Sequence, residues 1–177
     1  MPTFEPLDDG VEVRGSAILS IVNGVPDAFT GQARELLAEN GIEDPQPDEW
    51  YSQAAYLDAY RAVADRVGER TLEQIGRSTP ENAEWPPGVD TPLAALESVD
   101  DAYQMNHRGG EIGSYEVVDG DDGRATVRCR NPYPCVYDQG LLQGTVEVFS
   151  DDYASIDETS DRCREDGADA CTYEVTW

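Results

Sequence analysis

The sequence contains no lysine, and its strongly basic residues are twelve arginines set against 37 acidic residues. The formal net charge is therefore −25 over 177 residues. Nucleic-acid phosphates are bound by clustered Arg or Lys side chains, and the one local cluster in this chain is Arg124, Arg128 and Arg130. We therefore expect no nucleic-acid partner.

Long apolar runs are also missing. No run approaches the ~20 residues that a membrane-spanning helix requires. The N-terminus, MPTFEPLDDG, is acidic and has no signal-peptide pattern. The sequence therefore predicts a cytoplasmic protein with no membrane partner and with reduced thiols.

The excess of acidic residues has three explanations. A chain this acidic can be disordered, although the apolar periodicities described below argue against disorder. It can bind a basic protein, or it can come from a cytoplasm of molar salt, where the Debye length falls to ~3 Å and carboxylates keep the surface hydrated. The acidic residues are spread from the N-terminus to Glu174, which favours a halophilic, high-salt-adapted protein.

The apolar spacing changes along the chain and predicts the fold class. Residues 1–10 are predicted to form a flexible arm, and residues 11–177 form one ligand-binding-type domain. Helical spacing occurs over 29–42, 50–67 and 92–107, whereas residues 114–130 and 155–177 predict two hairpins on either side of a helix over 134–149. We therefore predict an α+β fold, with a helical N-terminal half packed on a small antiparallel sheet made of two hairpins with an intervening helix.

Cysteine is scarce, and its four copies lie in two stretches, CRNPYPC and CREDGADAC. Strand alternation puts Cys129 on the face of Ala125 and Val127, where a thiol is a small buried hydrophobic side chain. Cys129 is therefore predicted to be a core residue, with a role as a fourth metal ligand as the alternative.

The other three cysteines can converge. Cys163 and Cys171 bracket a hairpin loop, and Cys135 opens a predicted helix, where unsatisfied backbone amides favour a thiolate. Three convergent thiolates suit tetrahedral zinc, and reduced structural thiols and disulfides are the alternatives. The fourth ligand stays open between Cys129, Glu158, Asp161 and water.

The last third of the chain resembles a known family over residues 129–177. The resemblance rests on an Asn-Pro segment, a Cys at a helix start, the Gly140–Gly144 spacing, and a hairpin with Cys163, Cys171 and Tyr173-Glu174-Val175. This pattern is similar to the 4-vinyl-reductase-like ligand-binding domain, whose superfamily includes haem-nitric-oxide-binding domains and subunits of Golgi transport complexes. The resemblance implies a structural zinc held by Cys135, Cys163 and Cys171, and it puts Ser160 where the family has a glutamate ligand.

The same resemblance bears on haem. Superfamily members that bind haem carry a histidine on the helix before the first hairpin, and Tyr103, rather than His107, is the closer match to that position. The family's arginine-and-tyrosine pattern for haem propionates is missing around CRNPYPC. We therefore do not expect haem as the cofactor. His107 is predicted to interact with the last carbonyls of its helix, with a role in the ligand pocket as the alternative.

These features predict a small-molecule-binding regulatory or sensory domain, without catalytic residues, that carries a structural Cys-rich zinc site. We expect a small hydrophobic or aromatic ligand, a homodimer, and a separate output protein. The alternatives are a tetrapyrrole-binding accessory or reductase-like enzyme, a thiol-dependent redox protein, and a ligand-free protein–protein adaptor. The resemblance implies a cavity between the helices and the sheet, and the residues expected to line it are Tyr56, Tyr60, Trp85, Tyr103 and His107.

Overall fold

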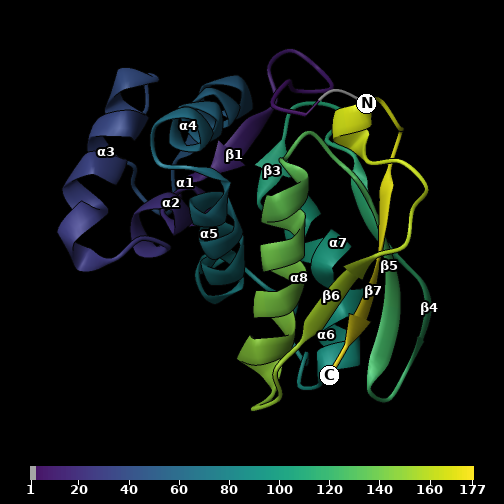
Figure 1. The fold of residues 1–177 in the computed structure, drawn as a ribbon. Helices are drawn as coiled ribbons and strands as arrows, with labels where there is room; N and C mark the ends of the chain where they lie inside the picture. Colours follow the sequence, from purple (N-terminus) through teal and green to yellow (C-terminus); the bar gives the residue numbers. More distant parts are fainter. Residues whose placement is uncertain (1–2) are drawn as a thin grey trace.

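The structure is a computed structural model that describes residues 3–177. It has a helical lobe formed by the N-terminal half of the chain and a sheet lobe formed by the C-terminal half, with one long helix between them (Figure 1). The helical lobe comprises β1 (Glu12–Arg14), α1 (Gly15–Ile18), α2 (Ser20–Asn23), the 3-10 helix η1 (Asp27–Phe29), α3 (Thr30–Glu39), β2 (Trp50–Ser52), α4 (Gln53–Arg66) and α5 (Glu69–Asn82).

The second half of the chain forms the sheet lobe. Its elements are α6 (Pro92–Glu97), α7 (Val99–Met105), β3 (His107–Arg108), β4 (Ser114–Asp121), β5 (Arg124–Arg130), α8 (Cys135–Phe149), β6 (Ser155–Glu158), the 3-10 helix η2 (Arg164–Asp166) and β7 (Cys171–Thr176). The main sheet has the order β4-β5-β7-β6, and all its pairings are antiparallel. The predicted α+β class, with two hairpins and an intervening helix, is confirmed.

A second sheet was not predicted. Its three strands have the order β2-β1-β3 and pair antiparallel. Each strand has only two or three residues, which is too short for an alternating pattern to be recognised. Because Trp50 to Ser52 pair with β1, the helix predicted over 50–67 begins at Gln53, where the Ser52 hydroxyl accepts a hydrogen bond from the Ala55 N–H at 3.4 Å.

The helix predicted over 92–107 is also interrupted. It divides at Ser98 into α6 and α7 and ends at Met105. His107 pairs with Val13 in the small sheet. The break brings the end of α7 and the edge of the helical lobe together, which is where the candidate ligand cavity lies.

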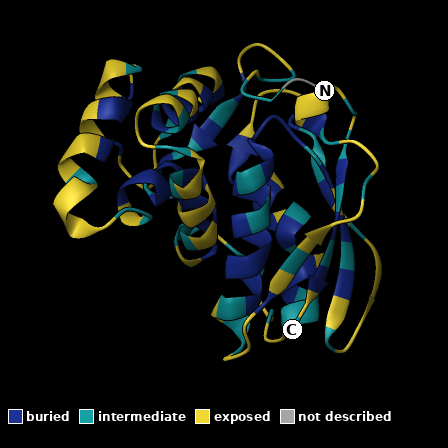
Figure 2. Cartoon of the chain, viewed as in Figure 1, coloured by how far each residue is buried: buried dark blue, intermediate teal, exposed yellow. Residues whose placement is uncertain are grey.

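Helix α8 lies between the two lobes and is largely buried (Figure 2). It packs closely against α5 because glycines lie at the contact. A Cβ atom at Gly140 would overlap the Glu73 carbonyl, and one at Gly144 would overlap the Arg77 carbonyl. The close approach fixes α8, whose first turn carries Cys135, against α5.

The alternation predicted for β5 is confirmed. Ala125, Val127 and Cys129 are buried, with 1% or less of each side chain exposed. Cys129 is the register partner of Cys171 in β7. The inner face of the sheet therefore packs on α8 and carries two of the four cysteines.

The predicted flexible arm spans residues 1–10, of which residues 1 and 2 lie outside the described residues. Within it, the Phe4 N–H donates a hydrogen bond to the Pro132 carbonyl at 2.7 Å. Over residues 3–177, no helix is both long and apolar enough to cross a bilayer.

Candidate functional site

A cavity of about 40 Å³ lies where the helical lobe meets the sheet lobe, and we call it the junction cavity. Its walls come from α1, α4, α5, α7, β3, β4 and α8 together with the loops between them. Nearly all its surface is aromatic or aliphatic, and the lining residues are Ala17, Tyr56, Thr79, Pro80, Ala83, Trp85, Val99, Ala102, Tyr103, Asn106, His107, Tyr115, Tyr133, Tyr137 and Leu141.

Tyr133 stands at the centre of a group of aromatic rings beside this cavity. Its ring centroid lies 5.2 Å from that of Tyr137, 5.7 Å from Tyr60 and 6.0 Å from Tyr56. The phenol of Tyr56 is 2.8 Å from that of Tyr60 and donates to the Ala17 carbonyl at 3.0 Å. The rings therefore join the two lobes through edge contacts and buried hydrogen bonds.

His107 is held between the lobes by both ring nitrogens. Nδ1 lies 2.8 Å from the Tyr103 carbonyl oxygen, and Nε2 lies 2.7 Å from the Tyr133 hydroxyl. Because a carbonyl can only accept, Nδ1 carries the proton and Nε2 accepts from Tyr133. Burial lowers the pKa of His107 to about 4, so the imidazole is neutral near pH 7. The predicted contact with a helix carbonyl is present.

Gln53 is the polar residue beside the cavity that sequence reasoning missed. It is fully buried, and neither atom of its amide has a hydrogen-bond partner among the described residues. Burial raises the pKa of Tyr103 and of Tyr133 well above the ordinary value, and the nearby Gln53 amide opposes this rise in both. The Gln53 amide therefore lies close to the Tyr103 and Tyr133 hydroxyls without a hydrogen bond of ordinary geometry to either.

Four of the five residues expected in the pocket line the junction cavity, namely Tyr56, Trp85, Tyr103 and His107. Tyr60 lies behind Tyr56 and does not reach the cavity surface. Tyr133 was missed because CRNPYPC was interpreted through its cysteines, and Tyr137 lies two residues beyond that stretch. The proline on each side of Tyr133 was the available signal, since it marks the end of the strand, and Tyr133 is buried there.

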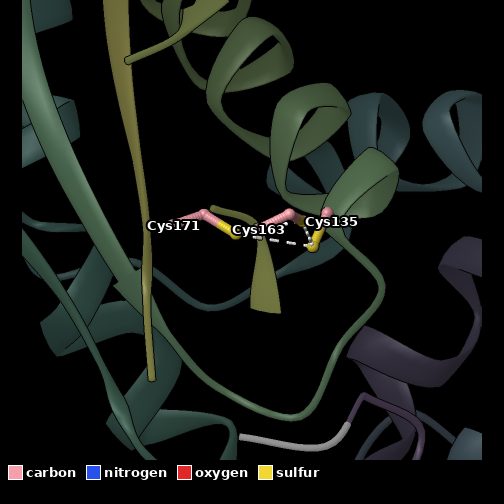
Figure 3. A group of neighbouring side chains, drawn as sticks. All are labelled: Cys135, Cys163 and Cys171. Carbon is pink, nitrogen blue, oxygen red and sulfur yellow. Dashed lines mark hydrogen bonds between the residues drawn. The ribbon is translucent and has the colours of Figure 1, made fainter. Parts of the chain in front are cut away.

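The second candidate site is a cluster of three thiols (Figure 3). Cys135 Sγ lies 2.7 Å from Cys163 Sγ and 3.5 Å from Cys171 Sγ, and the two hairpin sulfurs are 3.4 Å apart. Among the described residues, these are the His, Cys, Asp and Glu side chains close enough together to hold a metal ion. Cys129 neighbours Cys171 in the sheet but stays outside the cluster, as do Glu158 and Asp161.

Backbone amides support this thiol cluster. The Arg164 N–H donates to Cys171 Sγ at 3.2 Å, and the Cys135 N–H donates to the Glu165 carboxylate at 3.2 Å. A hydrogen bond from the Cys135 thiol, together with the Arg164 amide, lowers the pKa of Cys171 to about 4 against the effect of burial. The cluster therefore favours a thiolate at Cys171, while the shared hydrogen bond and burial raise the pKa of Cys135.

A buried ion pair connects the thiol cluster to the junction cavity. The Arg164 guanidinium contacts the Asp138 carboxylate, and both side chains are inaccessible to solvent. Arg164 Nη1 also donates to Asn131 Oδ1 at 2.7 Å, and the Tyr115 hydroxyl donates to Asp138 Oδ1 at 2.6 Å. Since Tyr115 lines the junction cavity, one continuous polar network runs from the cysteine loop to the cavity wall.

Comparison with known proteins gives matches at the level of structure. No family model and no curated protein matches the sequence. A haem protein studied for porphyrin distortion and haem redox potential matches with a TM-score of 0.68 and 17% identity, covering 93% of this chain and 99% of that one. The chain has the fold of H-NOX proteins.

Two further H-NOX structures show the same agreement. An H-NOX protein of S. oneidensis in the Fe(II)NO state matches with a TM-score of 0.65 and 16% identity, covering 92% of this chain and 97% of that one. An oxygen-binding H-NOX domain related to soluble guanylate cyclases matches with a TM-score of 0.66 and 18% identity, covering 92% of this chain and 94% of that one. These likenesses show the fold, and the 4-vinyl-reductase-like family stays a prediction.

The cofactor prediction, structural zinc without haem, is wrong. It excluded haem because Tyr103 matched the haem-ligating position and the propionate-binding pattern was missing. The solved structures with this fold include haem proteins and an Fe(II)NO complex, so that missing pattern is no ground for setting haem aside. The structure brings Cys135, Cys163 and Cys171 together and leaves Cys129 buried in the core beside them.

Proposed function

We propose that this chain is a sensory domain that binds a small molecule at the junction cavity. The observation that carries the proposal is the junction cavity itself, whose largely aromatic and aliphatic walls include the hydrogen-bonded pair His107 and Tyr133, with the buried Gln53 amide nearby. Ligand sites are typically apolar cavities with a few convergent polar groups and shifted pKa values. The H-NOX fold supports the proposal because similar structures are described with nitric oxide or oxygen bound.

The position of the cavity supports a sensory role. Its walls come from both lobes, so a ligand that fits one spacing of the lobes better than another shifts the population toward that spacing. The signal would pass to a separate output protein, and the acting form would be a homodimer in the cytoplasm. A small hydrophobic or aromatic molecule with one hydrogen-bonding group suits the aromatic walls and the few polar groups among them.

Haem is the first ligand to test, because haem proteins share the fold. The residue types fit: His107 is the imidazole that would bind the iron, and aromatic rings surround it. The junction cavity is too small for haem in this structure, because its volume of about 40 Å³ is far below the roughly 300 Å³ of a typical cofactor site. Haem binding therefore requires the tyrosine rings to move apart and His107 to release Tyr133.

A haem titration followed by visible absorption tests this candidate. If haem binds through His107, the wild type gains a stoichiometric Soret band that His107→Ala alters or loses, while the exposed control Tyr153→Ala retains it. If no band forms, haem is rejected. The ligand is then sought among small neutral aromatics by thermal shift, and Gln53→Leu is expected to reduce the shift.

Two results together would refute the small-molecule proposal. The first is that native mass spectrometry at several salt concentrations shows no retained ligand. The second is that neither haem nor the aromatic panel binds in a way that His107→Ala or Gln53→Leu changes. The remaining reading would then be a ligand-free adaptor. Binding that is insensitive to both substitutions would likewise place the ligand elsewhere on the protein.

A second proposal concerns Cys135, Cys163 and Cys171. The three sulfurs converge from α8, the η2 loop and β7, and convergent thiolates favour a thiophilic metal ion. Such an ion would fasten the final hairpin to the start of α8 and add its binding energy to folding. We expect elemental analysis of tag-free protein to find about one metal ion per chain, and we expect Cys163→Ser to lose most of this metal. Metal-free protein whose stability Cys163→Ser leaves unchanged would contradict this.

A further inference from the structure

A second cavity lies in the helical lobe, on the far side of α5 from α8, and we call it the α3 cleft. Its volume is about 220 Å³, against about 40 Å³ for the junction cavity. It is formed where α2, η1, α3, α4 and α5 meet, and its lining residues are Ile21, Val25, Pro26, Phe29, Gln32, Ala33, Leu36, Val63, Val67, Thr71 and Gln74.

The mouth of the α3 cleft exposes large apolar side chains. Phe29 is 50% exposed and Val67 is 55% exposed, and both line the cleft. The floor is different, because Ile21 and Val63 are almost fully buried. A single exposed apolar residue is ordinary, but two of them at the mouth of one apolar cavity indicate a surface built to contact something.

The lining of the α3 cleft is also uncharged, although 28% of the residues in the chain are charged. Its polar side chains are Gln32, Thr71 and Gln74, which are neutral and can both donate and accept hydrogen bonds. A charged ligand would find no counter-charge in this lining, and the overall charge of −25 would repel an anion. The chemistry of the walls therefore selects a neutral molecule.

The volume limits the size of that molecule. A cavity of about 150 Å³ lined by Leu, Ile and Phe is large enough to bind benzene. The α3 cleft is somewhat larger, at about 220 Å³, and its neutral polar groups lie beside the apolar floor. It therefore matches one substituted ring or a short branched chain bearing a hydroxyl or carbonyl group.

We propose that the α3 cleft binds a neutral, mainly apolar small molecule of single-ring size with one hydroxyl or carbonyl group. The site is separate from the junction cavity, because the two cavities share no lining residue, and α5 lies between α3 and α8 (Figure 1). Helix α3 is largely exposed on its outer side (Figure 2), so it can adjust to a ligand without disturbing the contact between α5 and α8.

The test uses 4-fluorobenzyl alcohol as the probe and follows its ¹⁹F NMR signal during titration of the full chain. Phe29→Ser and Val67→Ser remove apolar contact at the mouth, and both residues are exposed enough for the fold to persist. Removing one such contact weakens binding by roughly tenfold. The matched control is Val118→Ser, which is equally exposed on β4 and is expected to leave binding unchanged. His107→Ala, in the junction cavity, shows whether the probe binds there instead.

Several results would overturn the proposal. One is no binding of 4-fluorobenzyl alcohol at millimolar concentration, and another is binding that neither Phe29→Ser nor Val67→Ser weakens. Equal binding of the anionic analogue 4-fluorobenzoate would refute the neutral class. Loss of binding in His107→Ala alone would assign the probe to the junction cavity instead. If the probe does not bind and Val67→Ser changes self-association in sedimentation, the cleft is a protein contact.

Discussion

At the scale of single residues, His107 ties stability to pH. Its pKa is lowered by burial from 6.5 to about 4, so between these values the unfolded chain binds a proton that the folded protein does not. Stability therefore falls as pH decreases through this window, and the loss attributable to His107 is about 2 kcal/mol at pH 5.

The measurement is urea unfolding of the wild type and His107→Asn at pH 7 and pH 5. Carboxylates titrate in both proteins, so the difference between them isolates the imidazole. We expect the wild type to lose about 2 kcal/mol more than the variant. Identical losses would mean that His107 is solvated, and the junction would then be more open than described.

Arg164 gives a second prediction at this scale. Its guanidinium and the Asp138 carboxylate are both inaccessible to solvent, and removing one partner of a buried pair leaves the other charge uncompensated. Arg164→Met is expected to cost about 3–5 kcal/mol in denaturant unfolding. Adding Asp138→Asn should recover part of this loss, because the stranded charge is removed. A single-variant effect below about 1 kcal/mol would contradict the buried pairing.

The cysteines illustrate what could be predicted at the residue scale. Strand alternation separated Cys129 from Cys135 correctly, because a period of two depends only on local backbone geometry. The ion pair between Arg164 and Asp138 could not be found in this way. It joins residues 26 positions apart, and in a chain with 37 acidic residues no single carboxylate stands out in the sequence.

At the scale of elements, the contact between α5 and α8 depends on glycine. A Cβ atom at Gly140 or Gly144 would overlap the backbone of α5, so Gly140→Ala forces the helices apart and is expected to destabilise the protein by about 1–3 kcal/mol. Gly31 in α3 is the matched control, because a Cβ there meets nothing within 4 Å. Gly31→Ala should stabilise slightly, since alanine favours helix. Equal effects of the two substitutions in thermal unfolding would refute the close packing.

Elements with a long periodic pattern were predictable, and the short ones were not. The first hairpin and α8 carry their apolar residues at regular spacing over seven or more residues, so local pattern was sufficient. Strand β1 has three residues and pairs with segments far away in the chain. Its formation depends on tertiary contacts, which override local preference.

At the scale of the whole molecule, the sequence predicted where the junction cavity lies but not all of the residues around it. The aromatic residues of the helices were recognised, whereas Gln53 and Tyr133 were not, because their roles appear only when the lobes meet. The sequence pattern pointed away from haem, whereas the solved structures with this fold include haem proteins.

The net charge of −25 gives the last prediction. The described ion pairs involve most of the arginines, yet 37 acidic residues outnumber twelve basic ones, so the folded surface repels itself. Raising salt from about 0.02 M to 0.5 M shortens the Debye length from roughly 20 Å to 4 Å and should relieve this repulsion.

We expect the midpoint of thermal unfolding to rise by several degrees over this range, where general salting-out is still weak. Sodium and potassium chloride should act alike if screening is the cause. A flat midpoint would show that the unfolded chain repels itself equally, and the acidic surface would then serve solubility rather than stability.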